Sequence, residues 1–133
     1  ILAKLSKKFK FYPKYEGLYG ANLKRAIYGS KIVLNIHQNM MKFPEYLRIM
    51  LAMANKRLVI SEKINKIEPP ELRDYMISAP VNKLADKIDY YLHHKDEYDK
   101  IVNGGYKYIK KNFRIDFYIK QFAKKILIKN NLH

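Results

Sequence analysis

Two short runs of almost unbroken hydrophobic character stand in the first half of the chain. They are KIVLNI (Lys31–Ile36) and RLVIS (Arg57–Ser61), and both contain β-branched residues. Such runs are typical of strands that are buried on both faces, as in a parallel sheet covered by helices. The segment between them, residues 45–54, is apolar on most sides and follows Pro44, which predicts an enclosed helix. The pattern therefore predicts a strand–helix–strand unit with parallel strands.

The predicted helix carries one apolar stripe at helical spacing, but Ile49, Ala52 and Met53 are apolar too, so we expect this helix to be largely enclosed. The stripe consists of Leu47, Met50, Leu51 and Ala54. A turn at Asn55-Lys56 should then lead into the second strand, with Asn55 in the left-handed conformation that often ends a helix.

Shorter elements are predicted on both sides of this unit. Before it we expect a strand at Phe9–Tyr12 and a helix at Asn22–Tyr28, and after it a strand near Tyr75–Ser78. Three amphipathic helices close the chain, at Val81–His93, Asp96–Lys111 and Ile115–Lys129. Gly104-Gly105 lies inside a helical pattern with no strand before it, so the pair indicates close helix packing rather than a phosphate-binding loop.

The order of these elements predicts an α/β fold. We expect a Rossmann-like half with a small, mainly parallel sheet flanked by helices, and with three helices at its C-terminal end. No internal repeat or linker divides the chain, so residues 1–133 form a single predicted domain. Because the chain begins at Ile1 inside an apparent helix, we expect it to be a fragment of a longer protein.

Composition adds a strong positive charge to this picture. The formal net charge is +15, and there is no cysteine, which excludes disulfides and thiolate metal sites. Such a charge favours anionic partners such as nucleotides, nucleic acid or an acidic membrane surface. A lysine-rich composition without any functional meaning is the alternative, and the sequence leaves both interpretations open.

Candidate chemistry lies beyond the carboxyl ends of the two buried strands, where open parallel sheets bind their ligands. After the first strand, His37 begins a polar loop that leads into the N-terminus of a helix, which favours a phosphate group. Glu45 lies in the first turn of that helix and Arg48 one turn further. Arg48 could neutralise a diphosphate or form an ion pair with Glu45, and both remain possible at this stage.

The second strand ends at Ser61-Glu62, which could bind ribose or base hydroxyl groups or form an ordinary solvated turn. Together with the first loop, this edge predicts a donor and phosphate site made of His37, Glu45, Arg48, Ser61 and Glu62. No Ser–His–Asp set, pair of carboxylates or metal-binding pattern can be singled out, so the catalytic residues stay unassigned.

A resemblance to a known family is carried by two stretches, YGSKIVLNIH (Tyr28–His37) and FPEYLRIMLAMANKRLVISE (Phe43–Glu62). They resemble the C-terminal domain of GT-B-fold glycosyltransferases, in particular the group related to spore-maturation and group-1 glycosyltransferases. That group shows a strand ending in Leu-Asn, often followed by His, then an Arg-x-x-Glu-x-x-Ala helix and a strand ending near Ser. The resemblance continues through LADKIDYYL (Leu84–Leu92) and IVNGGYKYIKK (Ile101–Lys111), and it covers residues 20–128.

The chain departs from the family pattern at two positions. The Arg of the helix motif falls on Arg48, but its Glu, which bonds the donor's ribose in the wider family, is replaced by Leu51. Asn55 stands where the family has a Gly turn. The resemblance implies transfer of a sugar from a nucleotide-sugar to a glycan, lipid-linked or protein acceptor, as in polysaccharide biosynthesis. It implies no metal or cofactor, and it places the acceptor domain outside this chain.

Two other classes of function compete with this interpretation. Leu51 motivates a non-catalytic interaction module, because a leucine cannot bond a ribose hydroxyl. The charge of +15 and the 12 tyrosines motivate nucleic-acid binding, although no nucleic-acid motif is present.

No apolar run approaches the ~20 residues that span a bilayer. We therefore expect a cytoplasmic protein, with peripheral contact at the inner face of an anionic membrane as an alternative position.

Overall fold

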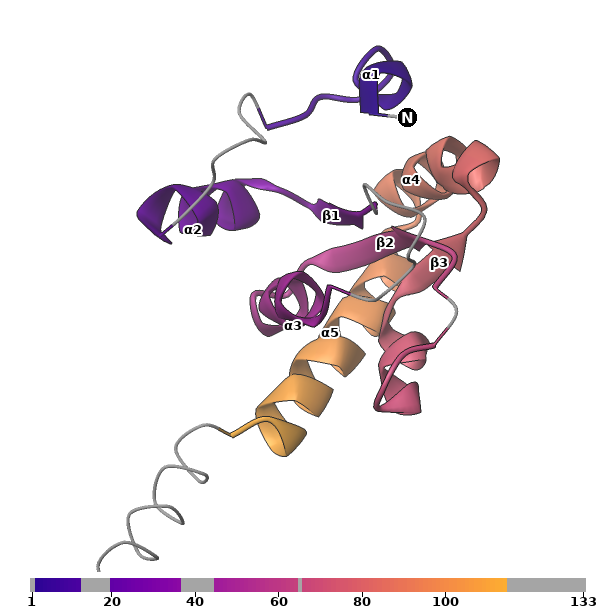
Figure 1. Cartoon of the computed structure of the whole chain (residues 1–133). Coiled ribbons are helices and arrows are strands. Elements are labelled where there is room, and N and C mark those ends of the chain that lie inside the picture. The colour runs from indigo at the N-terminus through magenta and orange to yellow at the C-terminus, as the bar shows by residue number, and fades with distance from the viewer. Residues whose placement is uncertain (1, 13–19, 37–44, 65, 115–133) are drawn as a thin grey trace, which may run out of the picture.

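The computed structural model describes residues 2–12, 20–36, 45–64 and 66–114, and it has an α/β architecture (Figure 1). Three parallel strands form one sheet in the order β1 (Ile32–Asn35), β2 (Leu58–Glu62) and β3 (Ile77–Ala79). All five residues of the central strand β2 are buried. The two predicted parallel strands are confirmed. The third begins two residues later than predicted because the 3-10 helix η1 (Pro70–Tyr75) extends to Tyr75.

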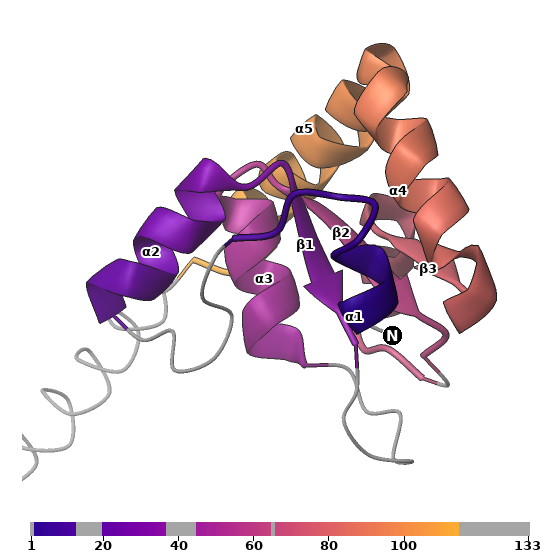
Figure 2. The same ribbon diagram turned by 90° about the horizontal axis from the view of Figure 1, so that it is seen from above.

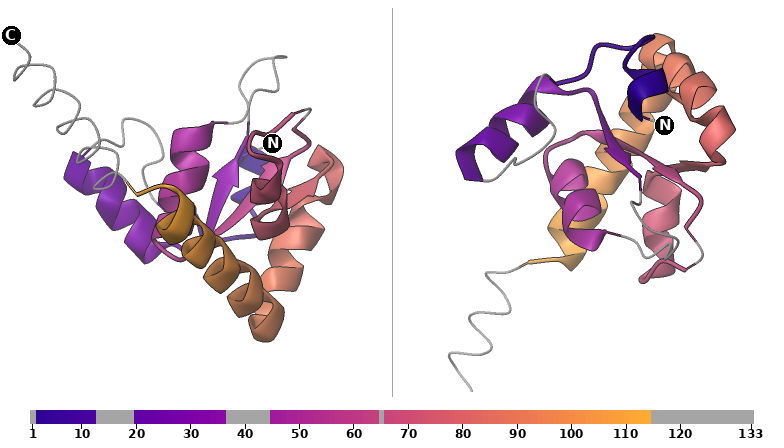
Figure 3. Two further views of the ribbon diagram at one scale, coloured as in Figure 1. Left: turned by 90° about the horizontal axis from the view of Figure 1, so that it is seen from below. Right: turned by 45° about the horizontal axis from the view of Figure 1, so that its top comes forward.

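Helices cover both faces of the sheet. One face carries α3 (Tyr46–Ala54) and η1, and the opposite face carries α1 (Leu2–Leu5) and α4 (Leu84–His93), which follows the 3-10 turn η2 (Val81–Lys83) (Figure 2). The long helix α5 (Lys95–Asn112) runs diagonally past the sheet (Figure 3) and contributes Val102 to one core cluster and Ile109 to the other.

The alternation of side chains along the strands divides the core into two clusters. Val33 and Val59 pack in the cluster formed by α3, η1 and the end of α5. Their neighbours along the two strands pack in the other cluster with α1 and α4; they are Ile32, Leu34, Leu58 and Ile60. Because successive side chains of a strand point to opposite faces, this alternation also fixes the face to which each later residue of β1 and β2 belongs.

Helix α2 (Gly20–Gly29) is held at its C-terminus by the residue that precedes β2. The guanidinium of Arg57 donates from Nε to the carbonyl oxygen of Ile27 at 3.0 Å and from Nη2 to that of Tyr28 at 2.9 Å. Two of the four carbonyl groups that a helix end leaves without intrahelical partners are thereby satisfied by a cation, which also suits the helix dipole.

The glycine pair of α5 confirms the predicted close packing. A Cβ atom on Gly104 would lie 2.9 Å from ring atoms of Tyr75, and one on Gly105 would lie 3.2 Å from Tyr75 Cβ and 3.3 Å from Met53 Cγ. The absence of side chains therefore lets α5 approach η1 and α3 closely.

The prediction that α3 is largely enclosed is wrong on the side of Leu47. Ile49, Ala52 and Met53 face the core with at most 1% exposure, whereas Leu47 is 81% exposed. Nearly every position of this helix is apolar, so several stripes fit the helical period and only contacts with the sheet select one of them. The turn also differs, because Lys56 rather than Asn55 takes the positive φ of 54°.

The strand predicted at Phe9–Tyr12 is also wrong, because these residues pair with no strand in the described part of the chain. Phe9 and Phe11 instead pack as partly buried side chains against the cluster of α1 and α4. The alternating pattern that suggested a strand therefore reflects a segment that covers the core.

The predicted helix at Ile115–Lys129 lies outside the described residues. No helix in the described ranges is long and apolar enough to cross a membrane.

Candidate functional site

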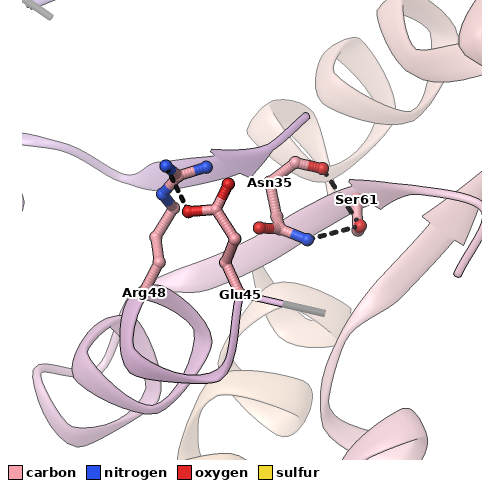
Figure 4. Close-up of polar contacts among 4 residues, drawn as sticks. All are labelled: Asn35, Glu45, Arg48 and Ser61. Carbon is pink, nitrogen blue, oxygen red and sulfur yellow. Dashed lines mark hydrogen bonds and ion pairs between the residues drawn. The ribbon is translucent and has the colours of Figure 1, made fainter. Parts of the chain in front are cut away.

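The carboxyl ends of β1 and β2 bring two buried polar residues together. Asn35 and Ser61 are paired in register as the last pair of the β1–β2 ladder, and both are 0% exposed. They follow Val33 and Val59 by two positions, so both lie on the face of the sheet that α3 covers. Figure 4 shows them beside the N-terminal turn of α3, from which Glu45 and Arg48 project.

Asn35 and Ser61 form a closed pair of hydrogen bonds. The hydroxyl of Ser61 donates to the backbone carbonyl of Asn35 at 3.0 Å, and the side-chain amide of Asn35 donates from Nδ2 to Ser61 Oγ at 3.0 Å. The Oδ1 atom of Asn35 has no hydrogen-bond partner among the described residues, although it is buried. Among the described residues, the edge therefore contains one internal polar link and one unused acceptor.

The N-terminus of α3 lies at the same edge. Glu45 occupies the N-cap position with φ −79° and ψ 78°, and no side chain caps the helix. The amide of Ile49 is the first that bonds back, to the carbonyl of Glu45 at 3.1 Å. The amides of residues 46–48 thus have no partner within the helix, and the helix dipole adds positive potential at this end.

Arg48 forms an ion pair with Glu45 at this helix end. The distance from Arg48 Nη2 to Glu45 Oε2 is 2.5 Å, and the two side chains are 41% and 44% exposed. Of the two roles predicted for Arg48, the ion pair with Glu45 is therefore the one that forms in the absence of a ligand. Because both groups remain accessible to solvent, an anion at the helix end could compete with Glu45 for the guanidinium.

Glu62 differs from the other predicted site residues in its position on the sheet. It follows Leu58 and Ile60 by alternation and so belongs to the face covered by α4. It is 8% exposed, and its backbone carbonyl accepts a hydrogen bond from Ser78 Oγ at 3.4 Å. The strand thus directs Ser61 and Glu62 to opposite faces.

The structure consequently brings three of the predicted residues to one side of the sheet, namely Glu45, Arg48 and Ser61, and places Glu62 on the other. His37 lies outside the described residues. The prediction missed Asn35, which is fully buried and pairs with Ser61 at the end of the ladder. One signal was available in the sequence, since Asn35 is the only polar residue inside the otherwise apolar run Ile32–Ile36.

The chemistry of this edge is that of a binding site. Amides without a partner inside the helix and a guanidinium stabilise negative charge, while Asn35 offers a neutral acceptor. No group of three His, Cys, Asp or Glu residues that could hold a metal ion occurs within the ranges that the structure describes.

Comparison with protein families gives one match, to a family described as glycosyl transferase-like, over residues 7–124. No curated protein matches the chain, and no solved structure matches it either. The matched region contains the whole sheet and all of the residues of the candidate site. Since the match spans most of the chain, and since the parallel sheet flanked by helices agrees with a Rossmann-like half, the protein belongs to the glycosyl transferase-like family.

Proposed function

We propose that this chain is the donor-binding domain of a nucleotide-sugar-dependent glycosyltransferase. Membership of the family supports a glycosyltransferase-type function in general. The observation that carries the finer proposal is the uncapped N-terminus of α3, which lies beside the carboxyl ends of β1 and β2 with Arg48 in its first turn. This is the edge at which parallel α/β sheets bind nucleotides.

In this proposal the donor diphosphate lies at the start of α3. The amides of residues 46–48, which have no partner inside the helix, and the helix dipole stabilise its charge, and Arg48 leaves Glu45 to bind a phosphate oxygen. The same groups stabilise the negative charge that develops on the leaving nucleoside diphosphate during sugar transfer. The predicted loop residue His37 remains part of this proposed site, whereas Glu62 lies on the opposite face of the sheet and is left out of it.

Titration with uridine, guanosine, adenosine and cytidine diphosphates, followed by NMR, tests the proposal. Arg48→Ala should weaken binding of the preferred nucleotide about tenfold, because a charge-assisted hydrogen bond of roughly 1.5 kcal/mol is lost. Glu45→Gln should strengthen binding, because it frees Arg48 and removes a negative charge next to the phosphate.

A matched control comes from the opposite end of the strands, where Lys56 lies two residues before β2. Lys56→Ala combined with Lys110→Ala removes two positive charges and should leave nucleotide affinity nearly unchanged. Absence of binding to all four nucleotides, or equal losses in Arg48→Ala and the lysine variant, would contradict a donor site at α3.

We also propose that the acceptor is a glycan or a lipid-linked or protein substrate, and that the protein contacts an anionic membrane from one side. The supporting surface is formed by Lys56 and Lys110, whose ammonium groups lie 4.9 Å and 5.9 Å from the ring centroid of Tyr106. Neither lysine forms an ion pair with another described residue. Two unpaired cations beside an aromatic ring suit an anionic lipid surface.

Sedimentation with vesicles of phosphatidylcholine containing phosphatidylserine tests this surface. The double variant Lys56→Ala/Lys110→Ala should reduce vesicle binding about 30-fold, since each lysine near an anionic surface contributes about 1 kcal/mol. Arg48→Ala, which removes a charge at the other edge, should have a smaller effect. If both variants bind vesicles like the wild type, this surface has no role in membrane contact.

A further inference from the structure

The side-chain oxygen of Asn35 is an acceptor that the fold itself does not use. Asn35 is 0% exposed, and its Oδ1 atom has no hydrogen-bond partner in the described part of the chain. A buried polar atom without a partner costs free energy, and most native proteins satisfy such atoms. An unused acceptor at the ligand-binding edge of a parallel sheet therefore points to a partner that arrives with a ligand.

The hydrogen bonds of Ser61 determine which atom of the amide is left over. The single hydroxyl proton of Ser61 is donated to the backbone carbonyl of Asn35, so Ser61 Oγ can only accept from the side chain that faces it. The amide of Asn35 must therefore present Nδ2 to Ser61, and Oδ1 must point away from it. Figure 4 shows Oδ1 on the side toward the first turn of α3.

The chemistry of Oδ1 limits what it can bind. A carbonyl oxygen accepts hydrogen bonds and cannot donate one. Phosphate oxygens at neutral pH are acceptors too, so the two groups cannot bond to each other. A phosphate would thus find donors at the amides of α3 and at Arg48, but not at Asn35. The complementary partner is a group with a hydrogen-bond donor, and nucleotide sugars carry hydroxyl donors on the ribose and on the sugar.

We propose that Asn35 binds a hydroxyl group of the nucleotide-sugar donor through Oδ1, and that Ser61 is a positioning residue that holds the amide in this orientation. The inference rests on the proposed function, because it assumes that a nucleotide binds at this edge. It divides the site into two parts, with the start of α3 contacting the diphosphate and the end of β1 contacting a hydroxyl. It also assigns a ligand-binding role to a neutral residue within the apolar strand.

The experiment measures the affinity of the 133-residue chain for a set of related nucleotides. The set contains the nucleoside diphosphate that the wild type prefers, its 2′-deoxy and 3′-deoxy forms, and the same nucleotide carrying glucose. Each ligand is titrated into the wild type, Asn35→Ala and Ser61→Ala, and the fold is checked by circular dichroism. If none of the nucleotides binds to the wild type, the proposed function fails, and the inference fails with it.

The pattern of losses identifies the hydroxyl. If Oδ1 accepts from the ribose, Asn35→Ala should weaken the ribonucleotide about tenfold and leave one deoxy form unaffected, because that form lacks the contact already. If Oδ1 accepts from the sugar, only the glucose conjugate should be weakened. Ser61→Ala should produce the same pattern with a smaller loss, and Ser61→Thr, which keeps a hydroxyl, should restore affinity.

Two results would overturn the inference while leaving the proposed function intact. One is an equal loss, or no loss, for all of the nucleotides in Asn35→Ala. The other needs no variant and therefore applies even if Asn35→Ala does not fold. It is a wild type that binds the ribonucleotide, both deoxy forms and the glucose conjugate with the same affinity.

Discussion

Two buried regions on the same face of the sheet are built in opposite ways. Where α5 meets α3 and η1, the contact is apolar and closed, with Gly105 of α5 against Met53 and Tyr75. At the carboxyl ends of β1 and β2, the buried residues Asn35 and Ser61 are polar, and one acceptor is left without a partner among the described residues. The first arrangement contributes only to stability, whereas the second sacrifices some stability for an unused hydrogen-bonding group.

Burial alone does not distinguish the two regions. Met53 is 1% exposed, and Asn35 is 0% exposed. What differs is whether each buried group has the partner that its chemistry requires. Methylene and ring carbons need only close contact, which the glycines provide, but an amide oxygen needs a donor. The region with an incomplete set of partners is thus the better candidate for ligand binding.

The largest effect is expected from a change that breaks the apolar contact. Gly105→Leu should lower the free energy of unfolding by about 3 kcal/mol, because the new side chain would meet Tyr75 and Met53 where a Cβ alone already approaches to 3.2 Å and 3.3 Å. Urea denaturation followed by circular dichroism measures this loss.

Gly29→Leu is the matched control for that substitution. Gly29 is also a helical glycine, at the last position of α2, but no atom lies within 4 Å of the position that its Cβ would take. Its replacement should therefore change the free energy of unfolding by less than about 0.5 kcal/mol. Equal losses for the two variants would mean that helix packing at Gly105 is not the constraint. The contrast between a closed and an open region would then lose its basis.

The sequence predicted the closed region well and the open region only in part. Continuous apolar runs predicted both paired strands, and the glycine pair predicted close helix packing, because the residues around each pattern favour one arrangement over the others. The face of α3 was not predictable in this way. Leu47 and Ile49 are equally apolar, yet one is 81% and the other 0% exposed, and only the position of the sheet distinguishes them.

The site was predictable at the level of the sheet edge but not at the level of individual contacts. Topology alone places residues after β1 and β2 near the start of α3, which explains the prediction of Glu45, Arg48 and Ser61. The separation of Ser61 from Glu62 follows from strand alternation once the buried face is known. The polarity of Asn35 within an apolar run is visible in the sequence, but its contacts are not, because they depend on the pairing register that places Asn35 opposite Ser61 and engages only one end of the amide.

A smaller effect of opposite sign is expected at the polar edge. Asn35→Leu should raise the free energy of unfolding by about 1 kcal/mol, because a leucine of similar branching removes the buried acceptor that has no partner while Ser61 still donates to the backbone carbonyl of residue 35. Ser61→Ala should lower stability by about 1 kcal/mol, because it removes both hydrogen bonds and leaves Nδ2 of Asn35 without a partner as well. Urea denaturation of the two variants beside the wild type, in the absence of nucleotide, gives both values. A loss of 2 kcal/mol or more in Asn35→Leu would show that the Asn35 side chain stabilises the unliganded protein, and its oxygen could then no longer be interpreted as a group kept free for a ligand.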